Sequence, residues 1–272
     1  MPSSTVIKRL VVFDFDWTLI EADSDFWVIQ NLGGELAKQQ AELFGKIQWT
    51  DLQDMLLGQL YEHGVTRQDL EKSLQEIPLT SDIAAALHLM KSQGAELCII
   101  SDANTFYIDT ILKAHGLDHL FTSIITNPAH FDDHGRLHVA RFHGLDKEPH
   151  GCKLPCHPNL CKGRELQKLI DAQTWDQVIY MGDSTNDFCP STRLSSSDYH
   201  GRGDLILARA NLLLEKEIQE HPEMIKAKVI YWDSPKDVLS ITQSVFSIPS
   251  TKHVPLAKTL AEEPILPLMT EA

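Results

Sequence analysis

Acidic side chains stand directly after three apolar runs in this sequence. The first run, at 10–13, reads as a buried strand and is followed by Asp14 and Asp16. If the strand geometry continues, these two side chains point the same way, and their negative charges repel one another. A hard divalent cation with oxygen ligands, above all Mg²⁺, would relieve that repulsion. The alternative is an ordinary acidic loop after a core strand.

The same pattern returns at two later apolar runs. Ser101 and Asp102 follow one of them, and Asp183 and Asp187 follow the other. If the strands are parallel, their carboxyl ends lie at one edge of the sheet, and the three clusters are expected to converge there. Phosphoryl transfer needs such a set, because it requires a nucleophile, an acid/base, a cation and hydrogen-bond donors for the phosphate oxygens.

Each of these residue types suits one role in that chemistry. Asp14 can act as the nucleophile and form an acyl phosphate. Asp16 can protonate the leaving oxygen and then activate the water that splits the intermediate. Asp183 would complete the Mg²⁺ shell, while Ser101 and Lys162, the latter at the start of a predicted helix, would hold the phosphate.

Apolar runs alternate with segments of helical periodicity, which predicts an α/β fold with a parallel sheet covered on both faces. The later strands are predicted at 95–100, 121–126, 178–181, 205–208 and 229–231, and helices at 80–93, 106–114, 161–172 and 211–220. The domains expected from this pattern are a core at 1–25 and 79–247, a helical cap at 26–78, and a tail at 248–272 that is Pro-rich and read as partly disordered. Within the core, 127–160 interrupts the rhythm with a predicted β-hairpin and a loop rich in Cys and His.

Composition narrows the class of protein. The 272 residues carry a net charge of −14, which argues against general binding of nucleic acid or anionic membranes. No apolar run approaches the roughly 20 residues that a membrane helix needs. The first ten residues have no apolar signal core, and five cysteines make a poor disulfide framework. These features favour a cytoplasmic protein, and the phosphoryl-transfer residues described above favour a small phosphorylated metabolite as its partner.

Four segments in order resemble the motifs of the haloacid dehalogenase-like (HAD) phosphatases. They are Asp14-Phe15-Asp16-Trp17-Thr18, Ile100-Ser101-Asp102, Lys162, and Gly182-Asp183-Ser184-Thr185-Asn186-Asp187. The helical insert between the first two resembles the C1-type cap of that superfamily. The resemblance implies a Rossmann-like core, an aspartyl-phosphate intermediate and Mg²⁺ held by Asp14, Asp16 and Asp183, with Asp16 contributing its backbone carbonyl.

Further segments are similar to the phosphoethanolamine/phosphocholine phosphatase branch, which also includes pyridoxal phosphate phosphatases. They are Ser24-Asp25, the stretch from Ile100 to Phe106, Thr126-Asn127-Pro128-Ala129, Gly135-Arg136-Leu137-His138-Val139, Asn159-Leu160-Cys161-Lys162-Gly163 and Asn186-Asp187-Phe188-Cys189-Pro190. This resemblance implies that Asp25 and Asp102 contact an ammonium headgroup. A helix cap is the rival reading of Asp25, and a turn residue that of Asp102. Asp187 is expected to orient Lys162 or a metal-bound water, with a helix cap as its alternative.

Aromatic residues near these motifs could also contact a cationic headgroup. Trp17, Trp27 and Phe106 are candidates, although ordinary packing is as good an explanation for each. Trp17 departs from the family pattern, which more often has a small or polar residue there. Its indole is expected to narrow the pocket or to stack on the substrate.

The Cys/His loop needs a separate interpretation. Three thiols and an imidazole could bind zinc, but they lack the paired C-x₂-C spacing of firm zinc sites, so reduced thiols in a loop are the favoured reading. These residues are Cys152, Cys156, His157 and Cys161, with His143 and His150 as further candidates. Cys98 is expected in the core, and Cys189 is expected to pack near the active site without reacting.

The sequence therefore predicts a Mg²⁺-dependent phosphomonoesterase acting on phosphoethanolamine or phosphocholine. Pyridoxal 5′-phosphate or another small phosphate is the alternative substrate. A non-catalytic metal- or ligand-binding protein on the same scaffold is the rival of another class, and the presence of both Asp14 and Asp16 speaks against it. A haloacid dehalogenase is disfavoured because carbon–halogen cleavage needs neither the second aspartate nor a metal.

Overall fold

Six parallel strands form one sheet in the part of the chain that the computed structural model describes, residues 7–145, 150–154, 156, 158–196 and 203–246. In spatial order they are β3 (Phe121–Asn127), β2 (Glu96–Asn104), β1 (Arg9–Phe13), β6 (Gln177–Gly182), β7 (Leu205–Arg209) and β8 (Lys228–Trp232). All five neighbouring pairs are parallel. The predicted α/β fold and the position of every predicted strand of this sheet are confirmed.

The central strand β1 shows why these residues form a buried sheet. Val11 and Phe13 face one apolar cluster, whereas Leu10 and Val12 face another, and all four are at most 1% exposed. A parallel strand covered on both faces needs such an unbroken apolar run. Because β1 lies between β2 and β6, the segments after these three strands meet at the middle of one edge.

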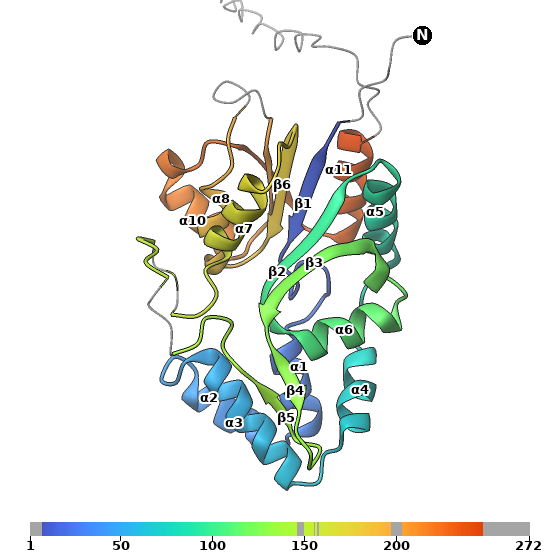
Figure 1. The fold of residues 1–272 in the computed structure, drawn as a ribbon, viewed down its shortest axis with the longest axis vertical. Coiled ribbons are helices and arrows are strands. Elements are labelled where there is room, and N and C mark those ends of the chain that lie inside the picture. The colour runs from blue at the N-terminus through green and yellow to red at the C-terminus, as the bar shows by residue number, and fades with distance from the viewer. Residues whose placement is uncertain (1–6, 146–149, 155, 157, 197–202, 247–272) are drawn as a thin grey trace, which may run out of the picture.

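Helices cover both faces of the sheet (Figure 1). One layer holds α5 (Ser81–Ser92), α6 (Thr105–Ala114) and α11 (Pro235–Phe246), and the other holds α7 (Lys162–Asp171), α8 (Phe188–Ser191) and α10 (Leu213–Glu220). Short 3₁₀ turns lie at η1 (Asp118–Leu120), η2 (Thr185–Asp187) and η3 (Pro222–Met224). The sequence prediction placed no helix at α11, which packs on α5 and buries Val238 and Phe246. Just before this helix, the Ser234 amide donates to the Asp237 carboxylate.

Residues 26–78 are largely helical, as the periodicity predicts. They contain most of α1 (Ser24–Leu32), which begins two residues earlier, and all of α2 (Leu36–Leu43), α3 (Trp49–Glu62) and α4 (Arg67–Gln75). These helices lie beyond the carboxyl ends of the central strands, at the lower end of Figure 1. Side chains cap these helices in the expected way: Asp23 accepts from the Phe26 amide, and Thr66 and Asp69 form a capping box. The division into core and cap is taken up below as part of the proposed function.

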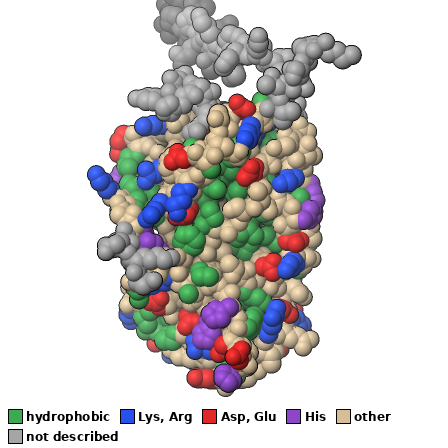
Figure 2. Space-filling model, in the orientation of Figure 1, with side chains coloured by type: hydrophobic (Ala, Val, Ile, Leu, Met, Phe, Trp, Pro, Cys, Tyr) green, Lys and Arg blue, Asp and Glu red, His purple; other side chains and the backbone are tan. Residues whose placement is uncertain are grey.

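The predicted hairpin is also present. Strands β4 (Ala129–Phe131) and β5 (Leu137–Val139) pair antiparallel, and β5 lies against α3. Asp54 of α3 accepts a hydrogen bond from the Val139 amide at 3.0 Å and from Arg136 Nη2 at 3.1 Å. The rings of His130 and His138 stack across the hairpin, and Figure 2 shows histidines grouped at this end of the molecule.

Two further expectations concern the C-terminal tail and a membrane-spanning helix. The tail at 248–272 lies outside the described residues. Within the described ranges, no helix combines the length and the apolar character that crossing a bilayer would require.

Candidate active site

The ends of β1, β2 and β6 bring together most of the residues that the sequence singled out. Asp14 follows β1, Ser101 and Asp102 lie at the end of β2, and Asp183 follows β6. After Asp14 the chain leaves the strand in a tight turn, in which the Leu19 amide donates to the Phe15 carbonyl at 2.8 Å. Trp17 takes a left-handed backbone conformation in this turn, with φ of 53°.

Lys162 lies between two carboxylates. Its ammonium Nζ is 2.6 Å from Asp14 Oδ2 and 2.8 Å from Asp187 Oδ1, and its side chain is fully buried at the first turn of α7. Burial lowers the pKa of this ammonium, but the Asp14 and Asp187 charges outweigh burial and hold the pKa above its ordinary value. Lys162 is therefore a permanent buried cation placed directly beside the predicted nucleophile.

Both carboxylate oxygens of Asp187 accept hydrogen bonds from neighbouring groups. One carboxylate oxygen receives the Tyr180 hydroxyl at 2.6 Å as well as Lys162, and the other receives the backbone amides of Asp183 and Ser184, each at 3.0 Å. These contacts fit the expected role of orienting Lys162. Gly182 leaves the room that Asp187 needs, since a Cβ there would lie 2.5 Å from Asp187 Cγ.

Asp14, Asp183 and Asp187 form a compact acidic cluster whose carboxylate oxygens lie within 4.8 Å of one another. Burial and the charge of Asp187 raise the pKa of Asp14 well above its ordinary range, against the opposing effect of Lys162. The same two causes raise the pKa of Asp183 to about 7. One buried lysine leaves an excess of negative charge here, so this all-oxygen donor set fits a hard divalent cation.

The Asp16 carboxylate does not point the same way as that of Asp14, although the alternation of side chains along a strand predicts that it would. Its two oxygens accept from the backbone amide and the hydroxyl of Ser24, at 3.0 and 3.2 Å, and it is not among the clustered carboxylates. The physical reason is that β1 ends at Phe13, so the alternation of strand side chains does not continue to position 16. Burial, followed by the charges of Asp23 and Asp25, raises the pKa of Asp16 well above its ordinary value.

A chain of polar contacts connects the end of β2 to Lys162. Asn186 donates its amide to Asp102 Oδ2 at 2.7 Å and accepts from Lys162 Nζ at 3.1 Å. Ser101 is 1% exposed, and its hydroxyl oxygen accepts the Ala103 amide at 3.2 Å. Sequence reasoning did not assign a role to Asn186, although its place in the fourth motif was the available signal.

Asp25 is buried near the start of α1, where Trp49 Nε1 donates to its Oδ2 at 2.8 Å. Burial and the charges of Asp23 and Asp102 raise the pKa of Asp25 well above its ordinary value. The indole of Trp49 packs with Phe26 and Phe44, an aromatic group that the sequence did not single out.

The aromatic residues that were singled out have other contacts. Trp17 is 42% exposed and lies against the guanidinium of Arg209. Trp27 donates its indole N–H to the Ser73 carbonyl, and Phe106 packs edge-on against Phe131. These contacts correspond to the packing alternative for Trp27 and Phe106.

All five cysteines are free thiols. Cys98 is fully buried in β2, as expected, and Cys152, Cys156 and Cys161 lie close together. The structure adds Cys189 to this group of three cysteines. The zinc ligands considered from the sequence did not include it. His157 lies outside the described residues.

A family model described as Putative Phosphatase matches residues 9–246 of this chain, which include the whole sheet and every cluster described above. The chain belongs to this phosphatase family. A thiamine phosphate phosphatase-like protein of Arabidopsis thaliana is similar at 37% identity over 234 residues, covering 85% of this chain and 92% of that protein. Pyridoxal phosphate phosphatase PHOSPHO2 of Mus musculus is 30% identical over 248 residues, covering 87% and 98%.

Among solved structures, a phospho-aspartyl intermediate analogue of phosphoserine phosphatase superposes with a TM-score of 0.55 at 16% identity, covering 86% of this chain and 99% of that one. This likeness shows the shared fold. The protein therefore has a Rossmann-like α/β fold, which it shares with a phosphoserine phosphatase, and it is a phosphomonoester hydrolase, as its sequence predicts.

Proposed function

We propose that this phosphatase hydrolyses small phosphate monoesters whose alcohol carries a cationic nitrogen, with phosphoethanolamine and phosphocholine as its best substrates. The reaction would use Mg²⁺ and pass through an aspartyl phosphate at Asp14. The observation that carries the proposal is the buried contact of 2.6 Å between the Asp14 carboxylate and Lys162, beside Asp183. A carboxylate and an ammonium at this separation can attack a phosphoryl group and bind its oxygens.

Two carboxylates would share the chemistry. Asp14 attacks phosphorus and forms the acyl phosphate, while Asp16 gives its proton to the departing alcohol oxygen. Asp16 then takes a proton from water, whose oxygen attacks phosphorus, releases inorganic phosphate and restores Asp14. The raised pKa of Asp16 favours the protonated form that the first step requires.

The remaining polar groups would bind phosphate and metal. Lys162 and the Ser101 hydroxyl would contact the phosphate oxygens. Mg²⁺ would be held by the side chains of Asp14 and Asp183 and the backbone carbonyl of Asp16, and when bound it supplies positive charge to the phosphoryl oxygens. The support for this set is its all-oxygen chemistry and the surplus of buried negative charge.

The region between α1 and the end of β2 would select the substrate. The charge of Asp102 acts on Asp25, whose carboxyl is buried. A cationic headgroup between Asp25 and Asp102 would relieve this repulsion and favour the ionised form of Asp25. The helices at 26–78 would then act as a cap that closes over the headgroup.

The test is phosphate release by the purified protein, with and without Mg²⁺, on phosphoethanolamine, phosphocholine, thiamine monophosphate and glycerol phosphate. We expect Mg²⁺-dependent turnover of the cationic esters and its loss in Asp14→Asn. Asp25→Asn should raise KM for the cationic esters and leave glycerol phosphate unchanged. The matched control is Asp109→Asn, because Asp109 is an exposed carboxylate paired with Lys113 on α6. Equal losses on cationic and uncharged esters in Asp25→Asn would refute the headgroup assignment.

Pyridoxal 5′-phosphate is the second candidate substrate, favoured by the similarity to a protein named for that activity. It is also the alternative that the sequence leaves open. Turnover of pyridoxal 5′-phosphate with none of the cationic esters would keep the mechanism and replace the headgroup proposal. Absence of turnover on every ester would instead support a binding protein on this scaffold.

A further inference from the structure

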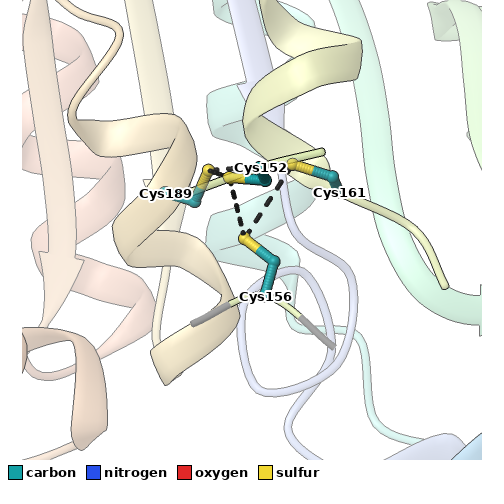
Figure 3. Close-up of side chains that lie close together, drawn as sticks. All are labelled: Cys152, Cys156, Cys161 and Cys189. Atoms are coloured by element: carbon teal, nitrogen blue, oxygen red, sulfur yellow. Dashed lines mark hydrogen bonds between the residues drawn. The ribbon is translucent and has the colours of Figure 1, made fainter. Parts of the chain in front are cut away.

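Four cysteine sulfurs lie together at the junction of the Cys/His loop, α7 and α8 (Figure 3). The Sγ of Cys152 is 3.6 Å from that of Cys189 and 3.5 Å from that of Cys156. The Sγ of Cys161 is 3.9 Å from that of Cys156 and 3.8 Å from that of Cys189. All four sulfurs lie within 4.8 Å of one another.

These separations match a known coordination geometry. Zinc bound by four thiolates is tetrahedral with Zn–S bonds of about 2.3 Å, which places the sulfurs about 3.8 Å apart. A disulfide would instead require two sulfurs at about 2.05 Å. Because four of the contacts fall between 3.5 and 3.9 Å, the arrangement fits one shared ion better than two cross-links.

We propose that Cys152, Cys156, Cys161 and Cys189 bind one structural zinc ion, with Cys189 rather than His157 as the fourth ligand. Each thiol gives its proton to solvent as the ion binds, so the thiolates supply all four ligands and leave no open position. Soft thiolates select zinc, whereas the carboxylate oxygens around Asp14 suit a hard cation, and the two sites would bind different metals.

The surrounding structure is built to keep the sulfurs together. Cys161 and Cys189 are each 3% exposed, and the Cys161 carbonyl accepts the Arg164 amide at the first turn of α7. Gly163 allows α7 to approach Cys189 closely, because a Cβ at Gly163 would lie 2.4 Å from the Cys189 Sγ. In the loop, the Cys152 amide donates to His150 Nδ1 at 3.2 Å.

The zinc would act on the active site through its neighbours in the chain. Cys161 immediately precedes Lys162, and Cys189 follows Asp187 by two residues. Lys162 and Asp187 form the buried ion pair of 2.8 Å beside the nucleophile. Binding Cys161 and Cys189 to one ion would fix the two backbone segments that carry this pair, and Cys152 and Cys156 would anchor the loop to them.

The first test measures the metal in the full-length protein, purified without added chelator. We expect about one zinc per chain by elemental analysis, and an X-ray absorption spectrum with four sulfur scatterers at about 2.3 Å. A protein that contains no zinc and does not take up zinc after reduction would overturn the proposal. A mass lower by two hydrogen atoms for each linked pair of cysteines, together with absence of zinc, would show disulfides in place of the zinc site.

Variants then test the ligand set. Cys152→Ser, Cys156→Ser, Cys161→Ser and Cys189→Ser should each weaken zinc binding more than the roughly 10–100-fold typical of losing a supporting residue. Cys98→Ala, at the buried thiol outside the cluster, and His157→Ala should keep full zinc content. Zinc retained in Cys189→Ser but lost in His157→Ala would refute Cys189 as the fourth ligand. The metal content of the native protein keeps the test valid if a variant fails to fold.

Discussion

At the scale of single residues, the site depends on one buried cation among several buried carboxylates. Lys162 contacts both Asp14 and Asp187, and no part of its side chain is exposed. Removing one partner of a buried ion pair leaves an uncompensated charge, which costs far more than losing a surface pair. We therefore expect the same lysine to support the fold and to prepare Asp14, the proposed nucleophile.

Replacing Lys162 by methionine tests that dual role. We expect Lys162→Met to lower the free energy of unfolding by about 3–5 kcal/mol and to abolish turnover. Lys168→Met is the matched control on the same helix, because Lys168 is mostly exposed and pairs with Glu165; it should change stability by about 1 kcal/mol or less. Denaturant titration measures the change in the free energy of unfolding, and a separate phosphate-release assay measures the loss of turnover. Similar small losses in the two variants would contradict a buried, charge-balancing Lys162.

The pKa of Asp25 leads to a prediction about pH. Burial raises this pKa, so the folded state holds the proton more tightly than the unfolded state, and the resulting stability is present at low pH and lost as pH rises through the raised pKa. Asp25→Asn should therefore raise the melting temperature, more at pH 8 than at pH 5. In the same variant the affinity for phosphocholine should fall at pH 8. A melting temperature lowered equally at both pH values would contradict this account of Asp25.

At the scale of elements, the fold was largely predictable and the contacts between loops were not. The apolar runs of the central sheet predict their strands because both faces of each strand must be buried. Helix α11 was missed although its sequence carries the signal, since its buried positions Val238, Thr242 and Phe246 recur at helical spacing. Asp16 points away from the acidic cluster since β1 ends before it, and Cys189 joins the other thiols through the close approach of α7 and α8.

The end of β6 allows a test of how an element positions the site. A methyl group at position 182 would collide with Asp187, whose carboxylate holds Lys162. Gly182→Ala should destabilise the protein by about 1–3 kcal/mol, as overpacking typically does, and lower kcat as well. Gly203→Ala is the control, because a Cβ there meets no atom within 4 Å. Unchanged kcat in Gly182→Ala would show that Asp187 does not position Lys162.

At the scale of the whole molecule, the chain has a net charge of −14, and several of its carboxylates are buried together at one edge of the sheet. Such a site stores electrostatic repulsion that a bound cation would relieve. The proposed metal binding would therefore be coupled to stability: an ion that binds only the folded state stabilises it by about 2.7 kcal/mol at one hundred times its dissociation constant.

Magnesium should accordingly raise the melting temperature in a concentration-dependent way. Asp183→Asn should remove most of that shift, since Asp183 is a proposed ligand. Asp171→Asn, at an exposed carboxylate near the end of α7, should keep it. Differential scanning calorimetry across a Mg²⁺ titration measures the effect, and an equal shift in both variants would place the ion elsewhere.

The central claim is that Asp14 becomes phosphorylated during turnover. The most direct measurement is rapid acid quenching of the enzyme during turnover of phosphocholine with Mg²⁺, followed by peptide mass spectrometry. The account predicts one added phosphoryl group on the peptide that contains Asp14, absent from Asp14→Asn and from samples without Mg²⁺. Full turnover with no phosphorylated peptide, or with the phosphoryl group on another residue, would contradict it.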